Sequence, residues 1–200
     1  MAHTLHRLAC FQAWLAAALA FGAQTAAAEP PRLVLPIDCT VGETCWIMAY
    51  VDHDPGEGVR DYACGIATYN EPPVNRHQGT DIALRDLGVM REGIFVRAAA
   101  AGKVLGRRDG VVDRSVRILG PASVAGRECG NGVRLDHGDG WTTQYCHLRE
   151  GSVTVKAGDE VNAGAILGLV GLSGMTEHPH LHFQLEHQGR IVDPFTGPER

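Results

Sequence analysis

Outside its first 28 residues, the sequence lacks any apolar run approaching the roughly 20 residues that a membrane-spanning helix requires. It also lacks an excess of basic residues, since 18 lysines and arginines stand against 23 aspartates and glutamates, for a net charge of −5. No internal repeat is evident, and no cysteine lies in a recognisable nucleophile motif. These absences argue against a membrane-embedded mature protein, a nucleic-acid partner and a cysteine-dependent enzyme.

The first 28 residues have the pattern of a secretory signal peptide. Arg7 stands in a short basic region, an apolar run reaches Phe21, and three alanines at 26–28 form a cleavage site. We therefore expect cleavage after Ala28 and a secreted or periplasmic protein of the bacterial cell envelope. The mature chain would carry 17 basic and 23 acidic residues, a net charge of −6, and is long enough for one well-buried core.

Short apolar runs broken by glycine recur along the chain, and we interpret them as strands. These runs are 46–51, 94–97, 103–106, 116–119, 133–135, 166–170 and 180–185. Long stretches with a helical period of 3.6 residues are few. The pattern is typical of an all-β sandwich or barrel.

Five cysteines follow the predicted cleavage site: Cys39, Cys45, Cys64, Cys129 and Cys146. In an oxidising compartment they are expected to form disulfides. Residues 132–137 and 141–147 form two predicted strands joined by the turn 137–140, which brings Cys129 and Cys146 together. The other three cysteines allow three pairings with one thiol left over.

Two short segments carry metal-binding side chains, HQGTD at 77–81 and HLH at 180–182. Histidine nitrogens and carboxylate oxygens are preferred zinc ligands. In a strand, His180 and His182 would share a face about 6.6 Å apart, whereas a straight strand would hold His77 and Asp81 roughly 13 Å apart. The chain must therefore bend, and Gly79 suits a bend because it reaches backbone conformations closed to other residues.

Three ligands with a fourth position left open are typical of a catalytic zinc site, so a zinc-dependent hydrolase is the leading hypothesis. Zinc at an open position lowers the pKa of bound water to roughly 7 and polarises a carbonyl group. Spacing alone does not decide whether His180 or His182 is the third ligand.

The surrounding residues add a specific context to the two segments. The sequence GTDIA follows His77, Pro179 precedes HLH, and YCHL lies between them at 145–148. This combination, over roughly residues 75–195, resembles the lysostaphin and LytM-type zinc metallopeptidases, which cut peptide bridges in bacterial cell walls.

The resemblance implies that His77, Asp81 and His182 bind Zn²⁺ and that His147 and His180 form a catalytic pair beside the metal. The sequence has no H-E-x-x-H motif, so the glutamate base of that metalloprotease class is absent and histidine must fill the role. The resemblance also implies a two-sheet sandwich of mainly antiparallel strands. We expect a loop-rich lead-in at 29–75 and the metallopeptidase domain at 76–200.

We therefore expect an endopeptidase that hydrolyses cross-links or stem peptides of peptidoglycan. The alternative is a non-catalytic envelope protein of the same fold that binds and regulates cell-wall hydrolases, but such proteins usually lack ligands that are intact here. A binding module with structural zinc is disfavoured because three ligands leave a coordination position open. Glycyl bridges and D-alanyl to diamino-acid cross-links both lie within the range that the resemblance implies.

Two residues depart from the pattern of many relatives. His178 stands where they have glycine before the His-x-His motif, and Gln184 stands where they have glutamate. The change at His178 could alter a substrate subsite or the pH profile, whereas the change at Gln184 has no clear consequence.

Overall fold

The computed structural model describes residues 29–70 and 76–197, so the predicted signal peptide lies outside the described residues. Strands dominate, with two short α-helices and one 3-10 helix. In chain order the elements are β1 (Cys45–Ala49), β2 (Thr80–Leu84), α1 (Leu87–Glu92), β3 (Phe95–Arg97), β4 (Gly102–Arg108), α2 (Val116–Leu119), η1 (Pro121–Val124), β5 (Asn131–Gly138), β6 (Trp141–Leu148), β7 (Glu160–Val161), β8 (Ile166–Leu169), β9 (His180–His187) and β10 (Arg190–Val192). In these ranges no helix has the length and apolar character needed to cross a bilayer.

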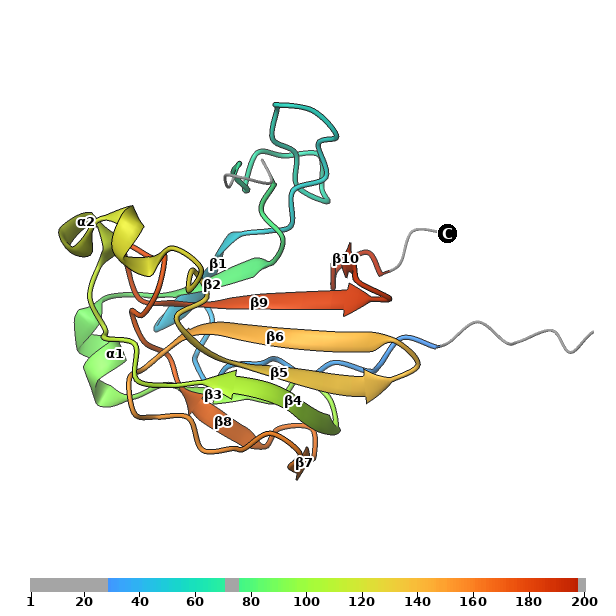
Figure 1. The fold of residues 1–200 in the computed structure, drawn as a ribbon. Coiled ribbons are helices and arrows are strands. Elements are labelled where there is room, and N and C mark those ends of the chain that lie inside the picture. Colours follow the sequence, from blue (N-terminus) through green and yellow to red (C-terminus); the bar gives the residue numbers. More distant parts are fainter. Residues whose placement is uncertain (1–28, 71–75, 198–200) are drawn as a thin grey trace, which may run out of the picture.

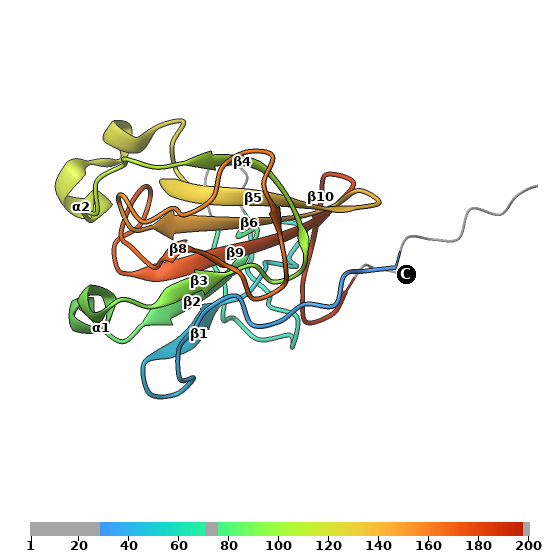
Figure 2. The same cartoon turned by 90° about the horizontal axis from the view of Figure 1, so that it is seen from below.

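The strands form two sheets, and every pairing between named strands is antiparallel. The large sheet has the order β1-β2-β9-β6-β5-β4-β7, with β10 paired to β9, and the small sheet pairs β3 with β8. Figure 1 shows the long strands of the large sheet lying side by side, with both α-helices at one end of them. Figure 2 shows the small sheet as a second layer against the large one. The predicted all-β, antiparallel, two-sheet fold is confirmed.

The hydrophobic core lies between the two sheets. Its members come from both layers and include Ile82, Leu84, Val96, Val133, Leu135, Tyr145, Leu167, Leu181 and Phe183. Along β9 the alternation of a strand turns Leu181 and Phe183 into this core. His180 and His182 consequently point to the opposite, outer face of the large sheet.

The predicted hairpin is confirmed, since β5 and β6 pair across the turn at Asp139 and Gly140. Both turn residues have positive φ, 51° and 83°, as tight hairpin turns require. The predicted Cys129–Cys146 disulfide is also confirmed. Cys39 pairs with Cys45, and Cys64 is a free, exposed thiol.

The prediction of a strand at 116–119 was wrong, because this segment is the short helix α2. The Ser115 hydroxyl accepts a hydrogen bond from the N–H of Arg117 at the start of the helix. Gly120, at φ 80°, ends the helix. Val116 is buried whereas Ile118 is 66% exposed. The two side chains therefore do not point into the core together, as alternate residues of a strand with one buried face would.

The lead-in contributes a strand to the large sheet, because β1 pairs with β2 in antiparallel register. Cys45 at the start of β1 is fully buried and belongs to the core. The predicted division of the chain at residue 75 stays a prediction, but strands from both sides of it lie in one sheet.

The Cys129–Cys146 disulfide joins residues 17 positions apart. On the chain-entropy account, a bridge of that span stabilises the folded state by about 3 kcal/mol. We expect the double variant Cys129→Ala/Cys146→Ala to unfold at a lower urea concentration, with a free energy of unfolding reduced by about that amount. Cys64→Ser is the matched control, and its unfolding midpoint should not move. Equal midpoints for all three proteins would contradict the stabilising role.

Candidate metal centre

The chain bends between His77 and Asp81 at Gly79, as predicted, but for a different physical reason. Gly79 is not among the glycines with positive φ. A Cβ atom at this position would instead lie 2.6 Å from Nε2 of His182 and 2.7 Å from the carbonyl oxygen of Phe183. Glycine is therefore required because β9 approaches so closely that a side chain has no room.

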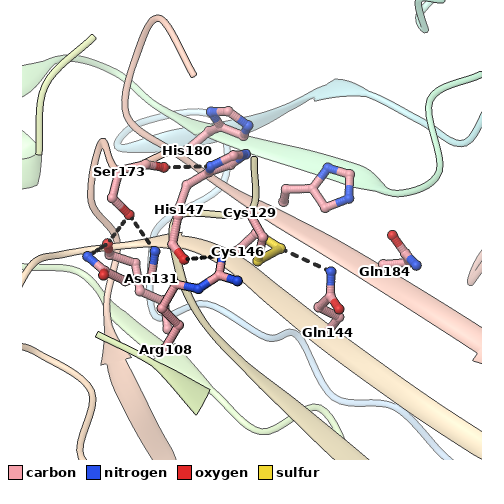
Figure 3. The surroundings of a disulfide bond; sticks show 12 residues. Arg108, Cys129, Asn131, Gln144, Cys146, His147, Ser173, His180 and Gln184 are labelled. Carbon is pink, nitrogen blue, oxygen red and sulfur yellow. Dashed lines mark hydrogen bonds between the residues drawn. A yellow bond between two sulfur atoms is a disulfide. The ribbon is translucent and has the colours of Figure 1, made fainter. Parts of the chain in front are cut away.

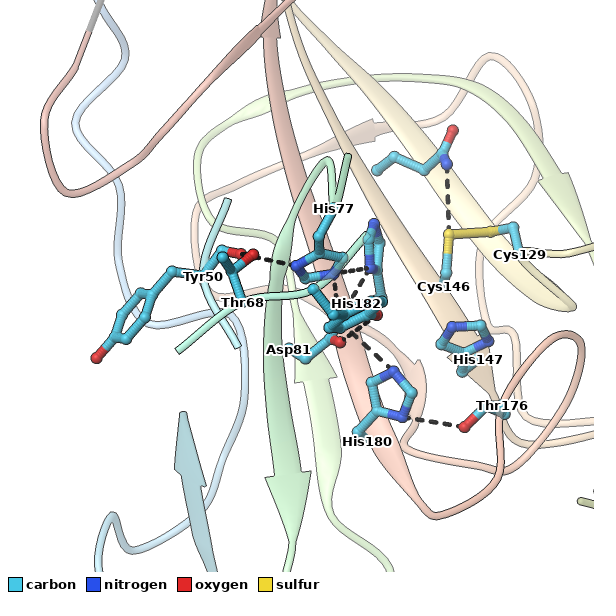
Figure 4. A network of polar contacts seen from close by, with 12 residues as sticks. Tyr50, Thr68, His77, Asp81, Cys129, Cys146, His147, Thr176, His180 and His182 are labelled. Atoms are coloured by element: carbon cyan, nitrogen blue, oxygen red, sulfur yellow. Dashed lines mark hydrogen bonds and ion pairs between the residues drawn. A yellow bond between two sulfur atoms is a disulfide. The ribbon is translucent and has the colours of Figure 1, made fainter. Parts of the chain in front are cut away.

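The bend brings His77 beside Asp81 and His182, which come from neighbouring strands. Asp81 on β2 and His182 on β9 are paired directly opposite each other. Oδ1 of Asp81 lies 2.9 Å from Nδ1 of His182 and 3.1 Å from Nε2 of His77, and the two nitrogens are 3.2 Å apart. Figure 4 shows the three side chains converging.

This donor set fits a zinc ion. Ligand atoms that are each about 2 Å from a tetrahedral ion lie roughly 3.3 Å from one another. The three observed separations lie close to this value, and in the described part of the chain these residues form a buried group able to hold a metal ion. Two imidazoles and one carboxylate leave a fourth coordination position for another ligand.

Hydrogen bonds orient the proposed ligands from outside the cluster. Nδ1 of His77 donates to the backbone carbonyl of Tyr50 at 2.7 Å, which leaves the lone pair of Nε2 directed at the cluster. Burial raises the pKa of the Asp81 carboxyl, but close polar contacts with the imidazoles of His182 and His77 outweigh burial and hold that pKa well below its usual value. Asp81 is therefore a carboxylate, as a metal ligand must be.

Tyr69 is part of the site, although no pattern in the sequence indicates it. Its hydroxyl donates to Oδ2 of Asp81 at 2.8 Å, and its ring stacks on His77 with centroids 4.3 Å apart. The neighbouring Thr68 hydroxyl bonds to the same Tyr50 carbonyl that receives His77. Residues of the lead-in thus contact His77 and Asp81 directly.

His147 and His180 lie next to the cluster on the same face of the large sheet. Their ring centroids are 4.6 Å apart, and the ring of His147 lies 6.1 Å from that of His182. Nε2 of His180 is 3.6 Å from Oδ1 of Asp81. The structure therefore brings all five predicted residues together, and none of them is more than 9% exposed.

Backbone carbonyls fix the tautomers of these two histidines. Nδ1 of His147 donates to the carbonyl of Ser173 at 2.8 Å, and Nδ1 of His180 donates to that of His178 at 3.0 Å. In both rings Nε2 is left as the basic nitrogen. Burial is the largest cause that lowers the pKa of each imidazole, well below the usual value for His147. Both are therefore neutral near pH 7.

The backbone of His147 is held in a left-handed conformation, with φ 62°, which is strained for a residue with a side chain. Its N–H donates to the carbonyl of Cys129 at 2.8 Å. Ser173 and Asn131 both donate to the carbonyl of Leu148, the next residue. Figure 3 shows these contacts surrounding the disulfide, which ties the strand carrying His147 to the preceding loop.

His178, which stands where many relatives have glycine, stacks on His180 with ring centroids 5.1 Å apart. Its Nε2 is buried and has no hydrogen-bond partner among the described residues. Its effect on substrate choice or pH profile stays a prediction.

Comparison with known proteins gives a family match. Residues 75–194 match the profile of Peptidase family M23. Among curated proteins, the chain is 31% identical over 117 residues to the cell division protein DipM of Caulobacter vibrioides, and 41% identical over 64 residues to the peptidoglycan DD-endopeptidase ShyA of Vibrio cholerae. These matches cover 57% and 32% of this chain, and 17% and 14% of those proteins.

A third relative is the glycyl-glycine endopeptidase ALE-1 of Staphylococcus capitis, 33% identical over 134 residues, or 66% of this chain and 29% of that protein. This chain therefore spans less than a third of the length of each of these three relatives. Solved structures share the fold. The SpoIIIAH–SpoIIQ complex matches with a TM-score of 0.56 at 19% identity over 82% of this chain and 97% of that one. A zinc-containing peptidase from Vibrio cholerae matches with a TM-score of 0.51 at 22% identity over 80% and 39%.

The hydrogen bond from Tyr69 to Asp81 predicts an effect on zinc affinity. We expect Tyr69→Phe to weaken zinc affinity by about 10-fold to 100-fold, because outer partners of metal ligands contribute on that scale. Competition with a chromogenic chelator measures the affinity directly.

The matched control is Tyr62→Phe, since the Tyr62 ring contacts the rings of Phe195 and Tyr50 and none of the proposed ligands, and phenylalanine keeps that ring. It should bind zinc as the unaltered protein does. Equal affinities for both variants would show that the Tyr69 hydroxyl does not support the ligand.

Proposed function

The chain belongs to peptidase family M23, and from this membership we propose that it is a zinc-dependent endopeptidase, secreted to the bacterial cell envelope, that cuts peptide bonds of peptidoglycan. The observation that carries the proposal is one buried group of side chains. His77, Asp81 and His182 have the spacing of zinc ligands, and the neutral pair His147 and His180 lies beside them. The names of ShyA and ALE-1 describe endopeptidases, which supports the same class of reaction here.

In this proposal His77, Asp81 and His182 hold the metal. When bound there, zinc supplies Lewis-acid polarisation of the scissile carbonyl and of an attacking water molecule. The buried side chain of Asp81 would also offset part of the positive charge of the ion, because it is ionised.

Proton transfer falls to the two other histidines. A neutral imidazole whose Nε2 is basic can accept the proton of an attacking water molecule, and His147 has that tautomer because Nδ1 donates to Ser173. His180 has the same arrangement with the carbonyl of His178. Once protonated, either ring can stabilise negative charge on the carbonyl oxygen or deliver the proton to the leaving amine. Positioned groups of this kind contribute about 10²-fold to 10⁴-fold in rate.

The first test of the proposal measures activity on the polymer itself. The purified protein, incubated with isolated peptidoglycan, should release peptides, and a zinc chelator should abolish that release until zinc is returned. Mass spectrometry of the products obtained from walls of different cross-link chemistry identifies the bond. Binding to peptidoglycan without release of any peptide would favour the non-catalytic alternative.

A second test separates the roles of the histidines. His147→Ala and His180→Ala should retain zinc but lose about a hundredfold or more in kcat, because they remove proton transfer and leave the ligands in place. His182→Ala should lose the metal as well.

Zinc analysis and rate assays are made on the same preparations of each variant. Equal loss of zinc in all three variants would overturn the division into ligands and proton-transfer residues.

A further inference from the structure

A hollow of about 210 Å³ lies on the outer face of the large sheet. Three arginines line it, Arg107, Arg108 and Arg134, together with the amide of Gln144, and its lining contains no carboxylate. Such a concentration of positive charge is unusual for this chain, which carries a net charge of −5. A hollow lined in this way attracts an anion.

The hollow adjoins the candidate metal centre through consecutive strands. His182 on β9 is paired with Cys146 on β6, and the disulfide from Cys146 leads to Cys129, which lines the hollow. On the far side, Arg108 on β4 is paired with Gly132 on β5. With strands about 4.8 Å apart, three strand spacings set the backbone of Arg108 roughly 14 Å from that of His182.

Glycine at position 132 lets the Cys129–Cys146 disulfide lie close to the sheet where it borders the hollow. A Cβ atom at position 132 would lie 2.8 Å from Sγ of Cys129 and 2.5 Å from the carbonyl oxygen of Tyr145. A side chain at this position would therefore displace the disulfide that borders the hollow. Figure 3 shows Arg108 and Gln144 beside the disulfide, with His147 and His180 beyond it.

The three arginines differ in how far their charge is already neutralised. Arg134 pairs with Glu186 at 2.6 Å, and Arg107 lies 4.0 Å from Asp109. Arg108 makes a single long hydrogen bond, 3.4 Å, to the carbonyl of Gly130. Together with backbone hydrogen bonds, its charge contributes to lowering the pKa of the Glu128 carboxyl, but it has no ion pair within 4 Å among the described residues. Its guanidinium therefore keeps donors for an incoming anion.

We propose that this hollow is a substrate subsite that binds a free carboxylate of the peptide being cut, with Arg108 as the principal anion-binding residue. The inference rests on the proposed function. A guanidinium suits this task because its planar donors match the two oxygens of a carboxylate. At about 3.3 Å per residue, an extended peptide with its scissile bond at the metal centre spans that distance of roughly 14 Å in about four residues. Arg108 acts on substrate selection and takes no part in proton transfer.

The experiment uses pairs of synthetic stem peptides that differ only by a carboxylate or a carboxamide at one position. The unaltered protein should cut the free-acid form with a KM about fivefold lower than the amide form and with a similar kcat, as expected for an exposed charge-assisted contact. Arg108→Gln should abolish that difference, and Arg108→Lys should retain part of it. Arg32→Gln, which removes an exposed arginine elsewhere, should keep the full preference.

Failure of this inference is distinguishable from failure of the proposed function. If both peptide forms are cut with equal KM at every position tested, the endopeptidase assignment stands and the subsite is refuted. If neither form is cut, the proposed function fails, and equilibrium binding of the same peptides to the zinc-free protein then decides the subsite. Equal affinities for acid and amide, or an acid preference that persists in Arg108→Gln, would refute it.

Discussion

The register of β2 on β9 is the constraint on which the candidate site depends. Asp81 and His182 are partners across these strands, so their side chains leave the same face of the sheet at adjacent points. A slip of one residue would turn His182 into the core and Leu181 out to solvent. The buried neighbours Ile82 and Leu181 oppose such a slip, because each would lose its apolar surroundings. The apolar pattern on one face therefore aligns the polar residues on the other.

Burial of five ionisable side chains at one end of the sheet creates a second requirement. Buried polar groups without partners destabilise a fold by several kcal/mol each. Here backbone carbonyls from loops supply the partners. The carbonyls of Tyr50, Ser173 and His178 each accept a hydrogen bond from one histidine ring. The same bonds that satisfy the donors also determine which nitrogen is basic. Stability of the loops and chemistry of the site thus depend on the same contacts.

Much of this arrangement could be predicted from the sequence, because it is encoded in local patterns. Alternation along β9 predicts that His180 and His182 share a face, and the turn at 137–140 predicts the hairpin and its disulfide. Tyr69 could not be found in this way, since its contact with Asp81 depends on how the lead-in folds back, and no local period encodes that path. The segment 116–119 was misassigned because four apolar-rich residues suit a strand or a helical turn, and the cap at Ser115 decided between them.

The lead-in determines how much of the chain is needed to transfer this site to another protein. The match to the family profile begins at residue 75, yet the Tyr50 carbonyl and the Tyr69 hydroxyl both come from earlier in the chain. A gene fusion carrying only residues 75–194 would deliver every proposed ligand while omitting two groups that hold them. The smallest segment that carries the complete site is therefore longer than the segment that matches the family profile, and engineered chimaeras should place their junction ahead of β1.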